Sequence, residues 1–414
     1  MKIGQFANRY GVSRDTLRYY IKMGLLMPRT AGSQLDFEEK DGKELEQILK
    51  LKNMRLSLTE IQNILYLHRM SNFIEPSTLN YCIELLENKK MELEKEKKEL
   101  EQSIKLIHRT INDLKSRSIL IQKTQSGVPL KGLPLLRCPV CGGTFRIKDA
   151  DIQENALQQG KLECGCGYQA IISNGIIITP ERYTGAFDTP DMERKLYHET
   201  GAEYNSCALK CPEFMLNQLS KENMHNKVCL EANINGFFFV YNFLSKLPHD
   251  CLFIIVDKYP EVLFQYKTLI DTLYQDLSIL YIADAGEKLP LASDCIDNYL
   301  SLFGENEYSF YHCHCQLQDI APMLKEDAKV IGAYQSMPWN CKTRENLKHQ
   351  YPEGNLSMCN ISAFQKEYRE TGFKMDTVLL GTVTRTLKHH MYKSHVDGEP
   401  IEMYGFIAQR NIKK

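Results

Sequence analysis

A series of leucines and isoleucines at intervals of seven residues constrains the fold of this chain more than any other feature. Six apolar residues recur without a break in a segment rich in Glu and Lys, at Leu79, Leu86, Leu93, Leu100, Ile107 and Leu114. A second series at Ile83, Ile104 and Ile111 is interrupted by Lys90 and Lys97. Sustained heptads predict a long coiled-coil helix over residues 76–120 that joins two chains as a homodimer. The alternative is an amphipathic helix that packs on its own domain. Pairing with a second chain is favoured because a helix this long and polar has few other surfaces that could bury its apolar stripe.

The length and composition indicate a multidomain globular protein. A chain of 414 residues is expected to form roughly two to four domains. Its longest apolar runs are too short to span a bilayer, and its first residues carry no apolar signal segment, so we expect a cytoplasmic protein with no membrane partner. In a reducing compartment the 14 cysteines are expected to be metal ligands, free thiols or buried side chains rather than disulfides.

Residues 1–75 predict short helices, tight turns and a hairpin. Gly11 is placed to end a first helix, Ser13 to cap a second, and Gly24 to stop it. Residues 27–41 suit a β-hairpin wing, and two further helices follow. Residues 1–35 are also basic, because Asp15 is their only acid. The segment therefore predicts a winged helix-turn-helix with an electrostatic footprint for phosphate.

The same residues carry a family resemblance. The segment Gly11-Val12-Ser13-Arg14-Asp15-Thr16-Leu17-Arg18-Tyr19-Tyr20, then Lys22-Met23-Gly24-Leu25-Leu26-Met27-Pro28, closely resembles the signature of the MerR (mercury-resistance regulator) family. Arg55-Leu56-Ser57-Leu58-Thr59-Glu60-Ile61 continues the match, which covers residues 1–118. The resemblance implies dimers joined by an antiparallel coiled coil. It also implies an effector-bound form that distorts promoter DNA and so acts on RNA polymerase indirectly, at a deformation cost of about a few kcal/mol.

The predicted recognition helix supplies the candidate DNA contacts. Its first turn faces base edges, which selects Ser13, Arg14 and Thr16. The next turn places Arg18, Tyr19 and Tyr20 near phosphates, with a place in the core as an equal alternative for Tyr20. The family's wing arginine is missing, since the wing here reads Gly32-Ser33-Gln34-Leu35-Asp36-Phe37, and Asp36 would repel phosphate.

Four cysteines in two short turns predict a zinc module. A linker is expected at residues 121–137, followed by a small zinc-ribbon-like β module at residues 138–182. The ligand set would be Cys138, Cys141, Cys164 and Cys166, whose four thiolates suit a closed structural zinc site. The alternative is four reduced, unligated thiols. The run His312-Cys313-His314-Cys315 is a weaker candidate for a second metal or a thiol sensor, because alternate residues of a strand point to opposite faces.

Residues 183–414 predict an α/β doubly wound domain. Strand-like runs at 228–232, 252–257, 279–283, 299–303 and 328–333 alternate with helical segments, and this alternation indicates a parallel sheet covered on both faces. The segment resembles class I S-adenosylmethionine (SAM) methyltransferases that follow a zinc ribbon. The resemblance implies cofactor contacts from the loop after the first strand, the acid ending the second and the turn after the third. The matching residues are Glu231, Asn233, Gly236, Asp257, Asp284 and Ala285.

The first of these motifs departs from the family. Glycines are needed where the backbone approaches the cofactor, but Asn233, Asn235 and Phe237 stand at those positions. No catalytic signature is present. We therefore expect a degenerate, ligand-sensing domain that takes SAM, a related nucleoside or another small effector. The alternatives are an active SAM-dependent methyltransferase fused to its own regulator, and a zinc or thiol sensor.

Overall fold

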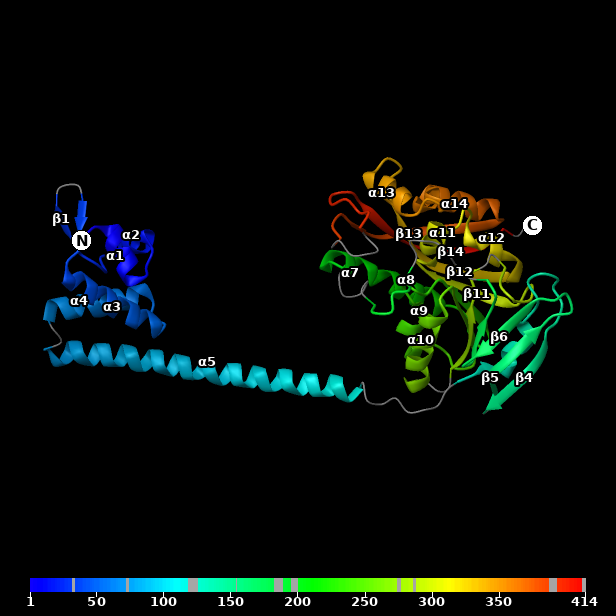
Figure 1. The fold of residues 1–414 in the computed structure, drawn as a ribbon, viewed down its shortest axis with the longest axis horizontal. Helices are drawn as coiled ribbons and strands as arrows, with labels where there is room; N and C mark the ends of the chain where they lie inside the picture. Colours follow the sequence, from blue (N-terminus) through cyan, green and yellow to red (C-terminus); the bar gives the residue numbers. More distant parts are fainter. Residues whose placement is uncertain are drawn as a thin grey trace. The chain divides into compact units, whose positions relative to one another are not determined.

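The computed structural model describes residues 1–31, 34–71, 74–117, 126–153, 155–181, 189–194, 200–273, 277–285, 288–386 and 393–411. The chain divides into two compact units, Met1–Leu120 and Ile121–Lys414 (Figure 1). Each unit has its own hydrophobic core. Within the described ranges, no helix combines the length and the apolar composition that crossing a membrane requires.

The N-terminal head of the first unit is the expected winged helix-turn-helix (Figure 1). Helix α1 (Ile3–Tyr10) ends at Gly11, whose φ of 65° is a left-handed conformation that glycine adopts without strain. Helix α2 (Arg14–Lys22) follows Ser13, whose Oγ accepts a hydrogen bond from the Thr16 N–H at 3.0 Å. Strands β1 (Arg29–Ala31) and β2 (Gln34–Asp36) pair antiparallel as the wing, and the wing residues 32–33 lie outside the described ranges.

Two more helices close the core of the head, α3 (Glu39–Asn53) and α4 (Leu58–Ser71). Each of the four helices contributes apolar side chains at helical spacing to one cluster. The cluster includes Phe6, Leu17, Tyr20, Leu45, Ile48, Ile61 and Leu65, with Phe37 from the chain that follows the wing. The predicted order of elements is therefore confirmed.

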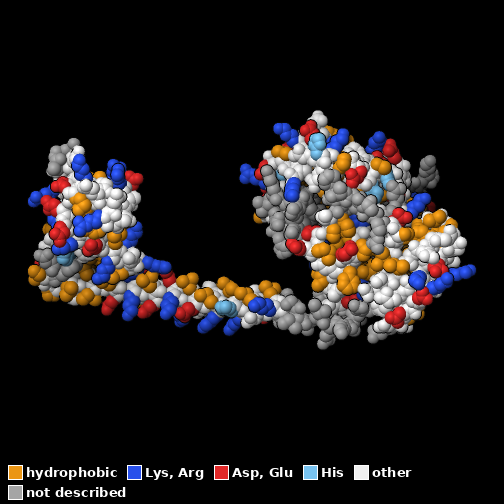
Figure 2. All heavy atoms as spheres, in the orientation of Figure 1, with side chains coloured by type: hydrophobic (Ala, Val, Ile, Leu, Met, Phe, Trp, Pro, Cys, Tyr) orange, Lys and Arg blue, Asp and Glu red, His pale blue; other side chains and the backbone are white. Residues whose placement is uncertain are grey.

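Helix α5 (Pro76–Arg117) is a single element of 42 residues, which confirms the predicted long helix. Near its start Cys82 is buried against the core of the head. Apart from half-buried Leu93, the apolar side chains of the two heptad series face solvent, and Figure 2 shows apolar side chains along this helix. The exposed members are Leu79, Ile83, Leu86, Leu100, Ile104, Ile107, Ile111 and Leu114.

In the described residues, the second unit is built on one sheet of 12 strands. Its main part has the order β10-β9-β8-β11-β12-β14-β13. The parallel strands are β8 (Val228–Ala232), β9 (Leu252–Asp257), β10 (Ser278–Ala283), β11 (Ile296–Leu302) and β12 (Leu324–Ser336). Strand β14 (Ile401–Arg410) runs antiparallel to both β12 and β13 (Phe373–Val383). In chain order the five parallel strands lie 3-2-1-4-5, which is the doubly wound arrangement that was predicted.

Both faces of this sheet are covered, because alternate residues of each strand enter different cores. In β9, Phe253 and Ile255 pack with α7 (Ala202–Ala208), α8 (Lys210–Leu219), α9 (Phe239–Asn242) and α10 (Pro260–Leu273). Ile254 and Val256 pack on the other face with α12 (Gln316–Ile320) and α14 (Ile361–Glu370). Helices α11 (Gly304–Tyr311) and α13 (Lys342–Gln350) follow the carboxyl ends of β11 and β12.

The cysteine module continues this sheet and is not a separate layer. Strands β4 (Arg146–Gln153), β5 (Ala156–Glu163), β6 (Gln169–Ser173) and β7 (Ile176–Ile178) pair antiparallel in sequence order. Strand β7 then pairs in parallel with β10. The module is thus anchored to the edge of the α/β domain, as Figure 1 shows for β4, β5 and β6.

Part of the segment predicted as a linker is packed. Strand β3 (Val128–Pro129) pairs with β5, and a 3-10 helix (Leu130–Leu135) follows it. A Cβ at Gly127 would lie 2.6 Å from the Leu157 carbonyl oxygen, so this glycine permits a close backbone approach. The glycines and prolines of this segment allow close packing. Because the same residues are also typical of linkers, composition alone predicted a linker here.

Candidate functional site

The exposed face of α2 presents most of the residues predicted to contact DNA. Ser13, Arg14 and Arg18 are exposed, and Tyr19 is 49% exposed, while Thr16 is half-buried beside the Ser13 cap. The Arg18 guanidinium donates to Asp15 Oδ1 at 3.2 Å, an exposed pair that phosphate can replace at little cost.

Tyr20 is the exception among these residues. It is 1% exposed and lies in the core of the head, and its hydroxyl accepts from Lys52 Nζ at 3.5 Å. A side chain placed there cannot reach a phosphate on the surface. The alternative left open by the sequence is therefore decided in favour of the core, because Tyr20 shares the helix face of Leu17.

The four predicted zinc ligands converge. The Sγ atoms of Cys138, Cys141, Cys164 and Cys166 all lie within 4.8 Å of one another. The Cys138–Cys166 and Cys141–Cys164 sulfur pairs are 3.5 and 3.3 Å apart. Tetrahedral zinc with bonds of about 2.3 Å holds sulfurs roughly 3.8 Å apart, so the donor set fits this ion.

Glycines shape the two turns that carry these sulfurs. Gly142 and Gly167 have φ of 70° and 98°, and their backbone N–H groups donate to the carbonyls of Cys138 and Cys164. A Cβ at Gly143 would lie 3.2–3.3 Å from two of the sulfurs, so the space beside the cluster suits glycine. A hydrogen bond from the Cys166 backbone lowers the pKa of the Cys164 thiol to about 7, toward the thiolate that metals bind.

The predicted cofactor residues meet at the carboxyl edge of the parallel strands, where Asp257, Asn233 and Glu231 use their side chains for hydrogen bonds within the protein. Asp257 Oδ2 accepts from the Asn235 N–H, and its Oδ1 from the Tyr259 N–H, both at 2.9 Å. Asp257 is 1% exposed, and burial together with nearby Glu307 raises its pKa to about 7. The Asn233 side chain donates to Gly304 O and Gln316 Oε1, at 3.2 and 2.7 Å.

The remaining cofactor candidates are also turned inward. Glu231 accepts from the Phe239 and Val240 N–H groups at 2.6 and 2.9 Å, and burial raises its pKa to about 8. The Asp284 side chain is buried, and its backbone N–H donates to the Asp257 carbonyl at 3.0 Å. Ala285 is half-buried in the same turn.

Three residues that the sequence analysis did not select complete this edge. Glu307 accepts from the Gly236 N–H at 3.2 Å and pairs with buried Lys258 at 3.4 Å. The Arg194 guanidinium donates to the Asn235 carbonyl at 2.6 Å and lies over the Tyr266 ring. No motif marks them, since they are far apart in sequence and come together only through the strand order.

The hollow at this edge is small. It lies between the loops after β8, β11 and β12, lined by Gly236, Phe237 and Phe303 among others, and has a volume of about 50 Å³. Pockets that bury a drug-sized ligand usually enclose about 300–1,000 Å³. Of the predicted cofactor residues only Gly236 lines this hollow, so its volume describes the space beside the predicted cofactor site and not the site itself.

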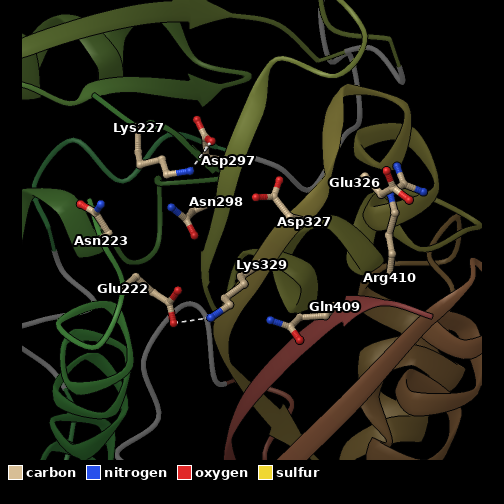
Figure 3. Close-up of a pocket in the computed structure, with 10 residues that line it drawn as sticks. All are labelled: Glu222, Asn223, Lys227, Asp297, Asn298, Glu326, Asp327, Lys329, Gln409 and Arg410. Carbon is tan, nitrogen blue, oxygen red and sulfur yellow. Dashed lines mark hydrogen bonds and ion pairs between the residues drawn. The ribbon is translucent and has the colours of Figure 1, made fainter. Parts of the chain in front are cut away.

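A larger, polar pocket lies at the opposite edge of the sheet, where β8, β11 and β12 begin (Figure 3). Its volume is about 380 Å³. Buried Asp297 accepts from Lys227 and Lys325 at 2.9 Å each and from the Val228 N–H, and Lys329 pairs with Glu222 across the pocket. Its position before the strands is not the one that doubly wound folds use for nucleotides.

The run His312–Cys315 does not bring three candidate metal ligands together in the described residues. In the described part of the chain, only the four-cysteine cluster brings three or more candidate ligands together. Cys313 is exposed, whereas Cys315 is buried with its Sγ 3.5 Å from Glu305 Oε2. The two thiols lie in different environments, which gives no support to the weaker candidate of a second metal in this run.

Among solved structures, the geranyl diphosphate methyltransferase in complex with SAM covers 56% of this chain and 99% of its own, with 11% identity and a TM-score of 0.38. The doubly wound fold of the second unit rests on its strand order.

The N-terminal part resembles proteins of one family. Residues 1–67 match the model of the MerR HTH family regulatory proteins. The chain is 37% identical over 73 residues to the HTH-type transcriptional regulator ZntR homolog of Haemophilus influenzae, covering 17% of this chain and 54%, about half, of that relative. It is 31% identical over 120 residues to the HTH-type transcriptional regulator YfmP of Bacillus subtilis, covering 28% of this chain and 84% of YfmP. The chain therefore belongs to the MerR family of helix-turn-helix regulators.

Proposed function

We propose that this protein is a cytoplasmic, homodimeric regulator that binds promoter DNA through α2 and responds to a small ligand through its α/β domain. The observation that supports DNA binding is the exposure of the first turns of α2. Ser13 and Arg14 stand at a capped helix start, where side chains can enter a groove, and Arg18 and Tyr19 follow on the same exposed surface.

Helix α5 supports the dimer. Its apolar seam is exposed over most of its length, and a 42-residue helix cannot shield that seam alone. A second copy of the helix offers a complementary surface at every heptad. Two heads would then read two half-sites of a palindromic operator.

Regulation would work through the DNA. A dimer that bends or untwists promoter DNA acts on RNA polymerase without touching it, at a cost of about a few kcal/mol. A ligand shifts the balance between two states of the protein only by binding one of them better.

For the α/β domain we propose sensing rather than methyl transfer. Both oxygens of Asp257 accept a backbone hydrogen bond, so ribose hydroxyls would have to share these oxygens with the protein's own turn. Asn233, Asn235 and Phe237 stand where the methyltransferase family has glycines, so a nucleoside such as SAM would meet these side chains at this edge. An active methyltransferase is the second candidate, which the strand order alone favours.

For the cysteine cluster we propose one structural zinc ion. All four positions of a tetrahedral site would be filled by protein, which leaves no position for a substrate. The cluster lies in the turns beside β4 and β6, so its role would be to hold the end of the sheet together.

Selection of bound sequences from random duplex DNA tests the proposal. The full chain should enrich an inverted repeat, and footprinting should place one head on each half-site. Enrichment of single half-sites would contradict the dimer, and absence of any enrichment would contradict DNA binding.

A further inference from the structure

Cys313 is an exposed thiol in a segment that the proposed DNA-binding function does not use. It lies between α11 and α12, on the carboxyl side of β11. Its Sγ is 3.8 Å from His314 Nδ1, within range of a hydrogen bond to sulfur. The neighbouring thiol of Cys315 is buried and bonded to Glu305 instead.

The other ring nitrogen of His314 is fixed by a carboxylate. His314 Nε2 lies 2.7 Å from Asp319 Oδ2, and both side chains are about one-fifth exposed. The Nε2–H therefore donates to Asp319, which leaves Nδ1 as an acceptor facing the thiol. This is the order of groups, nucleophile then imidazole then carboxylate, that activates a weak nucleophile.

Tyr308 holds this arrangement in place. Its hydroxyl donates to Asp319 Oδ2 at 2.7 Å and lies 3.2 Å from His314 Nε2. The Tyr308 ring stacks on His312, with centroids 3.7 Å apart and an interplanar angle of 2°. The carboxylate and the imidazole are thus positioned by α11 and α12 together, rather than by the accident that Cys313 and His314 are neighbours in sequence.

We propose that Cys313, His314 and Asp319 form a reactive thiol site for α,β-unsaturated carbonyl compounds. Cys313 is the nucleophile, and His314 and Asp319 are positioning and proton-transfer residues. The thiol proton passes to His314 Nδ1 while the sulfur bonds to the β-carbon of the alkene. The π electrons move to the carbonyl as an enolate, which takes the proton back from His314 at its α-carbon. The product is a thioether, and no oxidant or leaving group is needed.

This class of electrophile suits the site better than a peroxide does. Addition to an activated alkene needs a base and then an acid, and one imidazole can be both in turn. A reversible peroxide response would need a second thiol to form a disulfide. The adjacent thiol in sequence, Cys315, is buried among Glu305, Leu317 and their neighbours, so it does not offer that partner at the surface.

The experiment measures alkylation of the full chain by acrylamide at pH 7, with the adduct at Cys313 quantified by peptide mass spectrometry. An ordinary thiol is only a few per cent thiolate at pH 7. Native Cys313 should therefore react about tenfold faster than the same cysteine in concentrated urea. An equal or slower native rate would overturn the proposal, and this comparison needs no variant to fold.

Variants then separate positioning from structure. Asp319→Asn and His314→Gln should each lower the native rate at pH 7 several-fold, and the deficit should disappear near pH 10, where the thiol ionises without help. The matched control is Asp250→Asn, which alters the exposed ion pair between His225 and Asp250. The other ring nitrogen of His225 contacts Asn226 and not a thiol. Unchanged rates in both site variants, or an equal loss in Asp250→Asn, would also overturn the proposal.

Discussion

The backbone N–H of Asn235 donates to the carboxylate of Asp257 at 2.9 Å, across the edge where a doubly wound domain would hold a nucleotide. The N–H of Tyr259 occupies the other oxygen of the same carboxylate. Asp257 therefore closes the loop after β8 onto the end of β9. This relationship supports the proposal of a sensing domain, because the acid expected to hold ribose already anchors the protein's own turn.

The first prediction follows from that contact. The purified protein should show no transfer of a radiolabelled methyl group from SAM to RNA or to small acceptors. The physical reason is that Asp257 already anchors the loop after β8, and that Asn233, Asn235 and Phe237 stand where the methyltransferase family has glycines. Labelled product that disappears in Asp284→Ala would establish the enzyme instead.

The second prediction concerns DNA. Arg18→Ala should weaken binding to operator and to random duplex alike. The slope of the logarithm of the binding constant against the logarithm of the salt concentration should fall in magnitude by about one, as expected for a lost phosphate contact. Gel-shift titration over a range of salt concentrations measures both. Tyr20→Phe is the matched control and should bind normally, since Tyr20 is buried. A loss confined to the operator would show that Arg18 reads bases.

The third prediction concerns assembly. Leu100→Glu with Ile107→Glu should give monomers in sedimentation, because charges would be buried in the seam. Both residues belong to the heptad series and are exposed, at 62% and 58%. The control is Leu106→Glu, at an equally exposed position outside both series. A dimer that survives the double substitution would place the interface elsewhere.

The fourth prediction concerns metal. The purified chain should hold about one zinc ion, and Cys138→Ser with Cys141→Ser should remove it and lower the melting temperature, because metal binding is coupled to folding. Elemental analysis and calorimetry measure the two effects. Cys313→Ser should keep its zinc. Full zinc content in the double variant would contradict the assignment of the site.

The fifth prediction uses the polar pocket of Figure 3. Asp297→Asn should destabilise the α/β domain by about 2 kcal/mol, because it removes a charged hydrogen-bond acceptor. The loss is limited because Lys227 and Lys325, which are 33% and 39% exposed, can be hydrated by water instead. The lysines and the Val228 N–H lower the pKa of Asp297.

The pH dependence of that effect has a definite sign. A lowered pKa in the folded state stabilises the fold above the ordinary carboxyl range, near pH 4, and this stabilisation is lost as the pH falls through the folded value. The melting temperatures of wild type and Asp297→Asn should therefore differ at pH 7 and converge on acidification. Asp327→Asn, an exposed acid of the same pocket, should change little. A difference in melting temperature that stays the same on acidification would show that the charge of Asp297 does not stabilise the fold.

The sequence by itself determined the elements and their order. Ser13 and Gly11 are local signals, since a cap and a left-handed turn are properties of a few adjacent residues. The heptads of α5 and the strands β8 and β9 were also predicted, because period and apolar content are written along the chain. The four cysteines could be selected as ligands for the same reason.

Only the tertiary structure decided which polar groups remain available. The sequence placed Asp257 and Glu231 at a cofactor site, but the carboxylate oxygens of both accept hydrogen bonds from backbone N–H groups. It left Tyr20 open between surface and core, and it did not select Glu307 or Arg194 at all. The hydrogen bond between Asn235 and Asp257 spans 22 residues and depends on strand order, and the burial of Tyr20 and Glu231 depends on packing, neither of which is visible in local spacing.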